Sequence, residues 1–272
     1  MKTTTNNEPN NEPNKETYKL YGGKIELGYY PLRHIYSVDE KGVYGVTGIT
    51  SILPKPWMAA YVRKHAKLYF AVHSTQEYSK DVDYIGEGHF NEALTASDRY
   101  GQAAAQMGTN VHKFVQEWLE NKTFPQVNNQ QELNSFSAFW KFMNGVKLEP
   151  VLLERKIFSK KHQYAGTADF IGLVDGVRTL LDWKTSERIY ESYWLQLAAY
   201  VEAMNEEIKA DQKLKKKIGG EIEQIMIVRL GKDGGLEVRS TKKWDKEFQI
   251  FLHLLEVKAY LGSKKDQDGL IK

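Results

Sequence analysis

Two aspartates and a third carboxylate lie where one predicted β-hairpin could bring them together. Asp169 lies in the mostly apolar run 163–174, and Asp182 lies near the end of the next predicted strand, 179–183. The dipeptide Asp175-Gly176 between the strands is a strong hairpin signal. Across such a ladder the two carboxylates would repel each other unless a cation lay between them. Mg²⁺ is suited to this position, because it binds one or two carboxylates together with water and phosphate oxygens.

A lysine and another acid complete the set. Lys184 follows Asp182 by two residues, so both side chains lie on one face of a strand, and Glu154 occupies the predicted strand 150–159. The lysine could position or deprotonate a water, or stabilise developing negative charge, while a metal polarises the phosphate. These residues together predict phosphodiester hydrolysis, although an Asp-x-Lys triplet alone is more often a surface ion pair.

The order and spacing of these residues resemble the PD-(D/E)XK nuclease superfamily, specifically its RecB-type exonuclease branch. The resemblance covers about residues 150–200 and rests on Glu154, Gly166-Thr167-Ala168-Asp169, Leu181-Asp182-Trp183-Lys184-Thr185, and Gln196 with Tyr200. It implies catalytic roles for Glu154, Asp169, Asp182, Lys184, Gln196 and Tyr200, with Mg²⁺ or Mn²⁺ as the cofactor.

The resemblance extends upstream to a histidine on a helix. The segment 108–118 resembles the element that carries a metal-binding histidine in that branch, which implies His112, Asp169 and Asp182 as metal ligands. The alternative is a helical histidine with an ordinary hydrogen bond. Gln196 and Tyr200 are four residues apart and share a helical face, which the resemblance directs toward DNA. The alternative for them is a half-buried polar pair.

The chain has no cysteine, which excludes disulfides and a cysteine-bound iron–sulfur cluster. The cluster-bearing CRISPR-associated and helicase-fused members of the branch are therefore poor comparisons. The sequence also lacks a Walker motif. What remains resembles stand-alone exonucleases of the phage-recombination or mitochondrial genome-maintenance type.

Periodicity predicts an α/β (α+β) protein, in which helices flank a mixed β-sheet with a restriction-endonuclease-like core. The predicted helices span residues 57–72, 91–121 (as one helix, or as two with a break near Gly108), 131–144, 191–209 and 244–261. The predicted strands span residues 150–159, 163–174, 179–183, 223–230 and 236–240. The expected organisation is a disordered tail (1–17), an N-terminal helical and β elaboration (18–90), the nuclease core (91–262) and a polar tail (263–272).

The composition limits the size of the core and the net charge. The 272 residues are 41% hydrophobic, enough for one sizeable core, and the formal net charge is only +3. No stretch resembles a signal peptide or reaches the length of a transmembrane helix. We therefore expect a cytoplasmic protein, in a bacterium or a phage-infected host cell, with no membrane partner.

Basic and aromatic residues suggest where DNA would bind. The first predicted helix interleaves cations with aromatic rings, and a second group lies beside the hairpin; the candidates are Trp57, Tyr61, Arg63, Lys64, Lys156, Lys160 and Lys161. The run Lys213 to Lys217 is expected to be a solvated loop. The helix suits packing on the core equally well, but we expect the N-terminal lobe to clamp a DNA end.

These features predict a metal-dependent deoxyribonuclease, specifically an exonuclease acting on DNA ends in recombination, repair or replication. The alternatives are an endonuclease of the same fold and a noncatalytic DNA-binding or assembly protein. The expected partners are DNA, single- or double-stranded, and a recombination or replication protein. The sequence leaves open the polarity, the strand preference and the oligomeric state.

Overall fold

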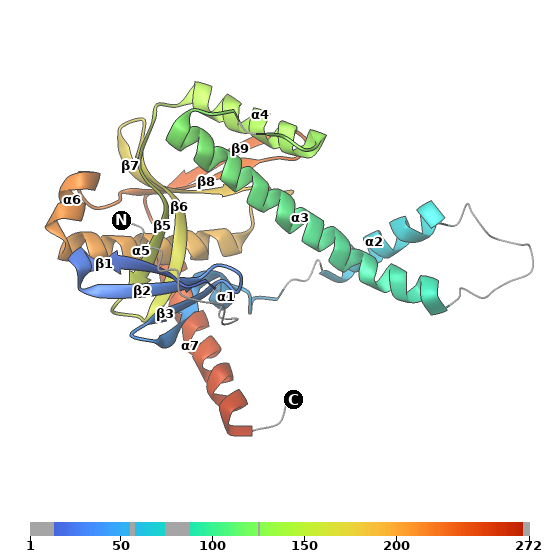
Figure 1. Cartoon of the computed structure of the whole chain (residues 1–272), viewed down its shortest axis with the longest axis horizontal. Helices are drawn as coiled ribbons and strands as arrows, with labels where there is room; N and C mark the ends of the chain where they lie inside the picture. Colours follow the sequence, from blue (N-terminus) through green and yellow to red (C-terminus); the bar gives the residue numbers. More distant parts are fainter. Residues whose placement is uncertain (1–13, 55–57, 74–86, 125, 269–272) are drawn as a thin grey trace, which may run out of the picture. The chain divides into compact units, whose positions relative to one another are not determined.

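The structure, a computed structural model, describes residues 14–54, 58–73, 87–124 and 126–268 (Figure 1). It contains two compact units. The first, called the sheet unit here, includes residues 14–53 and 114–268, and the second, called the helical unit, lies within residues 54–113. Each is described by itself below.

In the sheet unit, nine strands of the described residues form one mixed sheet, in the order β1-β2-β3-β4-β6-β7-β8-β9 with β5 on the other edge of β6. The strands are β1 (Glu16–Leu20), β2 (Ile25–Tyr30), β3 (Ile35–Val38), β4 (Lys41–Gly45), β5 (Leu148–Ser159), β6 (Tyr164–Val174), β7 (Val177–Lys184), β8 (Gln224–Leu230) and β9 (Leu236–Thr241). A short 3-10 turn, η1 (Tyr21–Gly23), joins β1 to β2.

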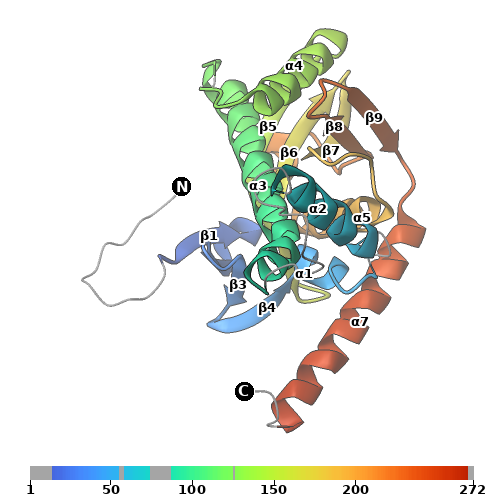
Figure 2. The same ribbon diagram turned by 90° about the vertical axis from the view of Figure 1, so that its right-hand side faces the viewer.

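Helices flank this sheet, as Figure 1 and Figure 2 show. They are α1 (Val46–Thr50), α4 (Gln130–Gly145), α5 (Glu191–Ala210), α6 (Gln212–Ile218) and α7 (Asp245–Asp268), together with the last part of α3 (Glu87–Asn121). Asn129 caps α4 by accepting a hydrogen bond from the backbone N–H of Glu132, and the Glu132 carboxylate accepts one from Asn128 N–H in return.

Strand β6 shares one of its edges between two neighbours. Strand β5 pairs antiparallel along the whole of β6, from Leu148↔Val174 to Ser159↔Tyr164, and so occupies one edge. The other edge pairs in parallel with β4 at residues 164 and 165, and antiparallel with β7 from Phe170 onward. Residues 166–169 therefore lie where the sheet changes partner, and this opening holds the predicted site.

The β6–β7 turn has the predicted hairpin geometry. Asp175 and Gly176 both have positive φ, 49° and 79°, and connect the paired residues Val174 and Val177. Positive φ at both central residues is what a type I′ turn requires. This turn sets the register that aligns β6 with β7.

The two faces of β7 have different neighbours. The ring of Trp183 lies edge-on to Phe139 and Phe142 of α4, with centroids 5.5 and 5.7 Å apart. Since side chains alternate along a strand, Asp182 and Lys184 point to the opposite face, where Lys184 meets α5. The tryptophan thereby fixes the orientation of both charged residues.

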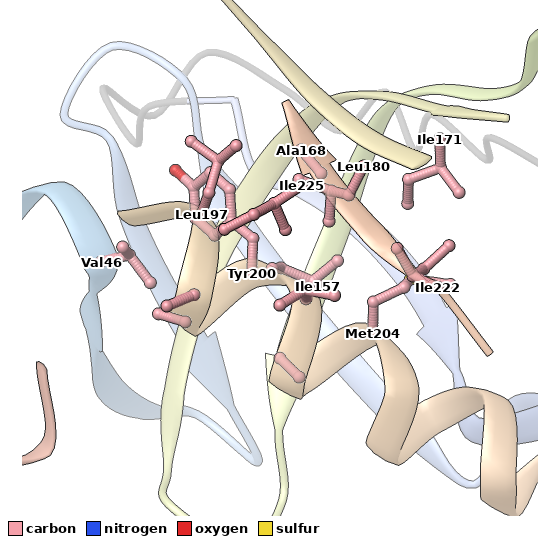
Figure 3. Packing of buried hydrophobic residues seen from close by; sticks show 14 of the residues in the cluster. Val46, Ile157, Ala168, Ile171, Leu180, Leu197, Tyr200, Met204, Ile222 and Ile225 are labelled. Atoms are coloured by element: carbon pink, nitrogen blue, oxygen red, sulfur yellow. The ribbon is translucent and has the colours of Figure 1, made fainter. Parts of the chain in front are cut away.

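Helix α5 covers the main core. Its Leu197 and Met204 are fully buried and pack with strand residues such as Ile157, Leu180 and Ile225 (Figure 3). Burial of these side chains contributes about 1.5–3 kcal/mol each. An ion pair between the half-buried Arg155 and the buried Glu207 (2.7 Å) reinforces this contact, and the Glu207 carboxylate also accepts a hydrogen bond from Tyr21 N–H. The N-terminal strands are thus tied to α5.

The helical unit consists of α2 (Met58–His73) and the first part of α3. Tyr69 of α2 packs with Ala93 and Ala96 of α3, and its hydroxyl donates a hydrogen bond to Glu92. The ring of His65 lies 4.3 Å from that of Tyr61 and also from that of Tyr100.

The predicted fold class is confirmed, since helices flank a mixed sheet. The predicted helices and strands from residue 131 onward are present with their bounds within about two residues, except that the last helix ends at Asp268 and not at residue 261. No helix in the described part of the chain is long and apolar enough to cross a bilayer.

Helix α3 continues through Gly108 as one helix, which decides between the one helix and the two helices expected there; buried side chains such as Met107 and Val111 outweigh the helix-weakening effect of about 1 kcal/mol of one glycine. The prediction of a loop at residues 213–217 was wrong. The lysine run 213–217 belongs to α6, which Asp211 caps at its start and Gly219 ends in a left-handed conformation.

The expected division of the chain also differs from the observed units. Strands β1–β4, assigned to an N-terminal elaboration, are part of the sheet, and β1 already includes Glu16, inside the expected tail. Residues 1–13 of that tail lie outside the described residues. Helix α7 extends to Asp268, beyond the expected end of the core at residue 262.

Candidate active site

The hairpin brings Asp169 and Asp182 to the opening in the sheet. The β6–β7 ladder has Phe170↔Leu181 as its outermost pair, and the two aspartates are the next residue on each strand. Asp169 accepts a hydrogen bond from the backbone N–H of Trp183 at 3.0 Å, and Asp182 is only 1% exposed. The aspartates thus lie just beyond the last backbone pair between β6 and β7.

Glu154 reaches the same place through an unusual backbone conformation. Its φ is 47°, which is uncommon for a residue with a side chain and costs about 1–3 kcal/mol. The pairs on either side of it, Leu153↔Phe170 and Arg155↔Ala168, are intact, whereas Glu154 is not paired with Asp169. The strand is distorted at the one residue whose carboxylate belongs to the site.

Glu154 and Asp169 lie close enough to hold one metal ion, since a carboxylate oxygen of each lies within 4.8 Å of the other. His112 is half-buried on α3, just before residues 114–121 of that helix, which belong to the sheet unit. Carboxylate oxygens are the ligands that Mg²⁺ and Mn²⁺ prefer, and imidazole is a common nitrogen ligand.

Burial and the crowding of negative charge together set the electrostatics of the site. Burial, followed by the charge of Asp169, raises the pKa of Glu154 from an ordinary 4.5 to about 8; Asp182 and Glu120 add to the effect, and Lys156 opposes it. Carboxylates that hinder one another's ionisation become stable anions when a divalent cation joins them. The residues therefore fit a magnesium or manganese ion.

Lys184 is the cation of the site. Its Nζ lies 2.5 Å from Asp182 Oδ2 and donates a hydrogen bond to Gln196 Oε1 at 3.4 Å. Burial lowers the pKa of Lys184, but Asp182 and Asp169 more than offset this, so the pKa lies above its usual value. Because a raised pKa keeps the Lys184 ammonium protonated, the residue is better suited to supplying positive charge than to acting as a base.

Gln196 and Tyr200 continue the chain of contacts on α5. Gln196 Nε2 donates to the Tyr200 hydroxyl at 2.8 Å, and both side chains are buried. The Tyr200 ring lies close to Gly166, where an added Cβ would be 2.4 Å from a ring carbon (Figure 3 shows Tyr200). A Cβ does not fit at that distance. The glycine three residues before Asp169 therefore makes room for the tyrosine, which positions Gln196 and, through it, Lys184.

The predicted DNA-binding residues are divided between the two units. In the helical unit, Arg63 and Lys64 are exposed and Tyr61 is half-buried, while Trp57 lies outside the described residues. Beside the hairpin, Lys160 and Lys161 are exposed, but Lys156 is 8% exposed, with its Nζ 4.6 Å from the ring centre of Tyr29. Lys156 thus belongs to the interior of the sheet unit.

Sequence reasoning missed several neighbours of the site. The centre of the Tyr193 ring lies 4.7 Å from Lys184 Nζ, and the Tyr36 hydroxyl shares a hydrogen bond with Thr167 Oγ1 at 2.9 Å. The negative charge of Glu120 adds to the rise in the pKa of Glu154. Only the Tyr193 region carried a signal, because Arg188 and three aromatic residues (Tyr190, Tyr193 and Trp194) lie between Lys184 and Gln196.

Comparison with known proteins gives a distant structural likeness. No family model and no curated protein matches the chain. One solved structure that is similar, an alkaline exonuclease (LHK-Exo) from Laribacter hongkongensis, shares 14% identity over 77% of this chain and 98% of its own, with a TM-score of 0.27. The same exonuclease in complex with dAMP gives 14% identity, 79% and 98% coverage and a TM-score of 0.26. At these scores the likeness carries no argument about activity.

The raised pKa of Glu154 predicts how the metal-free protein responds to pH. A carboxyl whose pKa is higher in the folded state contributes stability below pH 4.5, and this contribution is lost as the pH rises through about 8. The free energy of unfolding of the wild type should therefore fall between pH 5 and 9, and Glu154→Gln should reduce this fall by an amount on the order of 3 kcal/mol. Urea denaturation in EDTA measures this. Glu149→Gln, on the same strand, is the control. If the free energy of unfolding depended on pH equally in the wild type and in Glu154→Gln, the prediction would be contradicted.

Gly166→Ala should displace the Tyr200 ring and loosen the Gln196–Lys184 contact. We expect a loss of about 1–3 kcal/mol in the free energy of unfolding, as for other overpacked positions, together with lower activity. Gly42→Ala, where an added Cβ meets nothing within 4 Å, should change neither quantity. Thermal unfolding and the cleavage assay below provide the measurements. A Gly166→Ala protein with wild-type values in both would refute this role.

Proposed function

We propose that the protein is a metal-dependent deoxyribonuclease that hydrolyses phosphodiester bonds, acting as an exonuclease on DNA ends. The observation that carries the proposal is the convergence of Glu154, Asp169 and Asp182 with Lys184 at the opening of the sheet. Carboxylates that can hold a divalent cation, beside a fixed ammonium, are what phosphodiester hydrolysis requires.

Each residue has a role that its geometry supports. Glu154, Asp169 and Asp182, with His112, would hold Mg²⁺ or Mn²⁺, which when bound polarises the phosphate and lowers the pKa of water. Lys184 stabilises the negative charge that develops on the phosphate oxygens. Gln196 orients the Lys184 ammonium through its amide oxygen, and Tyr200 holds Gln196 in turn. The backbone N–H of Trp183 fixes the rotamer of Asp169.

Two other functions use the same residues differently. An endonuclease of this fold would cut within a strand, and a noncatalytic DNA-binding or assembly protein would bind without cutting. The complete set of acids and lysine favours catalysis over binding alone. We favour ends as the substrate because of the resemblance to exonucleases, and DNA recombination, repair or replication, with a partner protein from those processes, as the setting.

Cleavage of linear and covalently closed circular DNA tests the proposal. With Mg²⁺ or Mn²⁺, only the linear DNA should be degraded, and EDTA should stop the reaction. Asp182→Asn should lower the rate roughly a hundredfold or more, because charge stabilisation by a metal contributes several kcal/mol. Glu149→Gln, whose carboxylate pairs with the exposed Lys147, is the matched control.

Nicking of the circle would establish the endonuclease instead. Binding of both DNAs with no cleavage under any metal would show a noncatalytic protein and refute the proposal.

We also propose that the exposed cations of α2 contact DNA backbone phosphates. Deleting the chain up to residue 80 would remove strands β1–β4, so substitution is the cleaner test. Arg63→Ala combined with Lys64→Ala should reduce the dependence of log affinity on log salt by about 1.8, since each phosphate contact on duplex DNA contributes about 0.9. Lys215→Ala with Lys216→Ala on α6 is the charge-matched control. An unchanged salt dependence would contradict the clamp.

A further inference from the structure

The segment between β7 and α5 carries a row of rings and cations that begins at Lys184. Tyr193 has its ring centre 4.7 Å from Lys184 Nζ, and Tyr190 meets Tyr193 edge-on at 5.6 Å. The guanidinium of Arg188 lies 5.0 Å from the ring centre of Tyr190. Arg188 is exposed and both tyrosines are half-buried. We call Arg188, Tyr190 and Tyr193 the aromatic row; it leads from the site to the surface.

Local hydrogen bonds hold the aromatic row in place. Ser186 Oγ donates to the backbone carbonyl of Arg188 at 2.8 Å, which closes the loop. Tyr190 is the N-cap residue of α5, with φ −98° and ψ 149°, and its carbonyl accepts from Tyr193 N–H at 3.0 Å. The rings are thus set by the start of a well-packed helix, so binding a ligand there would cost little additional ordering.

The composition of the aromatic row suits one kind of nucleic acid. Tyrosine rings and the flat guanidinium of arginine both stack on bases, and arginine also pairs with phosphate. In duplex DNA the bases are stacked on one another and paired, whereas in a single strand they can turn onto a protein ring. Because the aromatic row adjoins Lys184, such a base would belong to a nucleotide near the phosphate that is cut.

We propose that the aromatic row binds single-stranded DNA next to the scissile phosphate, so that the site selects a single-stranded end over a blunt duplex. The inference rests on the proposed nuclease function and adds to it the strand preference and the residues that set it. Tyr190 supplies the stacking surface, Arg188 contacts a neighbouring phosphate, and Tyr193 links both to Lys184. If the aromatic row served only to pack the start of α5, substitutions in it would not change the preference for single-stranded over duplex DNA.

The test measures binding without cleavage, using the full chain in EDTA with a fluorescent single-stranded oligonucleotide and the matched blunt duplex. Tyr190→Ala should weaken single-strand binding by about 5- to 100-fold, the range for loss of one base stack, with less than about threefold effect on the duplex. Tyr190→Phe should bind as wild type, because the ring is kept. Arg188→Ala should lower the single-strand salt dependence by about 0.7. Tyr260→Ala, an exposed tyrosine on α7, is the matched control.

Thermal unfolding of each variant shows whether weaker binding comes from the loss of a stacking ring or from a loss of stability. If Tyr190→Ala is destabilised, Tyr190→Leu, which keeps apolar bulk at the start of the helix, replaces it in the binding test. The proposal is overturned if Tyr190→Ala and Tyr190→Leu bind the single strand as wild type does, if a folded variant loses both DNAs equally, or if wild type prefers the duplex. Since no cleavage is measured, these outcomes are independent of whether the protein cuts DNA, which the linear and circular substrates decide.

Discussion

Like-charge crowding at the opening of the sheet is the constraint on which the rest of the structure depends. Glu154, Asp169 and Asp182 meet where β6 leaves β4 and has not yet paired with β7, and burial, followed by the charge of Asp169, raises the pKa of Glu154 to about 8. A fold selected for stability alone would not gather three carboxylates in a half-buried place or put one of them at positive φ. The energetic cost of this arrangement is explained if a divalent cation normally binds between the three carboxylates, because the carboxylates are then its ligands.

The surrounding elements keep these groups in position. Trp183 is fixed against the helix α4 on one face of β7, so its neighbours Asp182 and Lys184 must face α5 on the other. On that helix, Tyr200 packs on Gly166 and holds Gln196, which contacts Lys184. The glycine, the glutamine and the tyrosine are therefore parts of one packing arrangement that ends at the lysine ammonium, which explains physically why they occur together.

Local signals were sufficient to predict much of this from the sequence. The alternation of residues 163–174 and the Asp175-Gly176 turn specify the hairpin, and its register places Asp169 beside Asp182 without further information. The parallel pairing of β4 with β6 could not be predicted, because it joins residues about 120 positions apart, and no local pattern reports it. The positive φ of Glu154 is likewise imposed by the tertiary structure. The burial of Lys156 was missed because a lysine on a strand gives no sign of the tyrosines that cover it.

The central claim is that the three carboxylates form a divalent-cation site, and anomalous diffraction from crystals grown with Mn²⁺ tests it most directly. The account predicts a manganese peak with oxygens of Glu154, Asp169 and Asp182 at about 2.0–2.2 Å, near the distances for Mg²⁺, and loss of that peak in Asp169→Asn. A manganese-saturated crystal with no peak there, and with Asp182 still paired to Lys184, would contradict it.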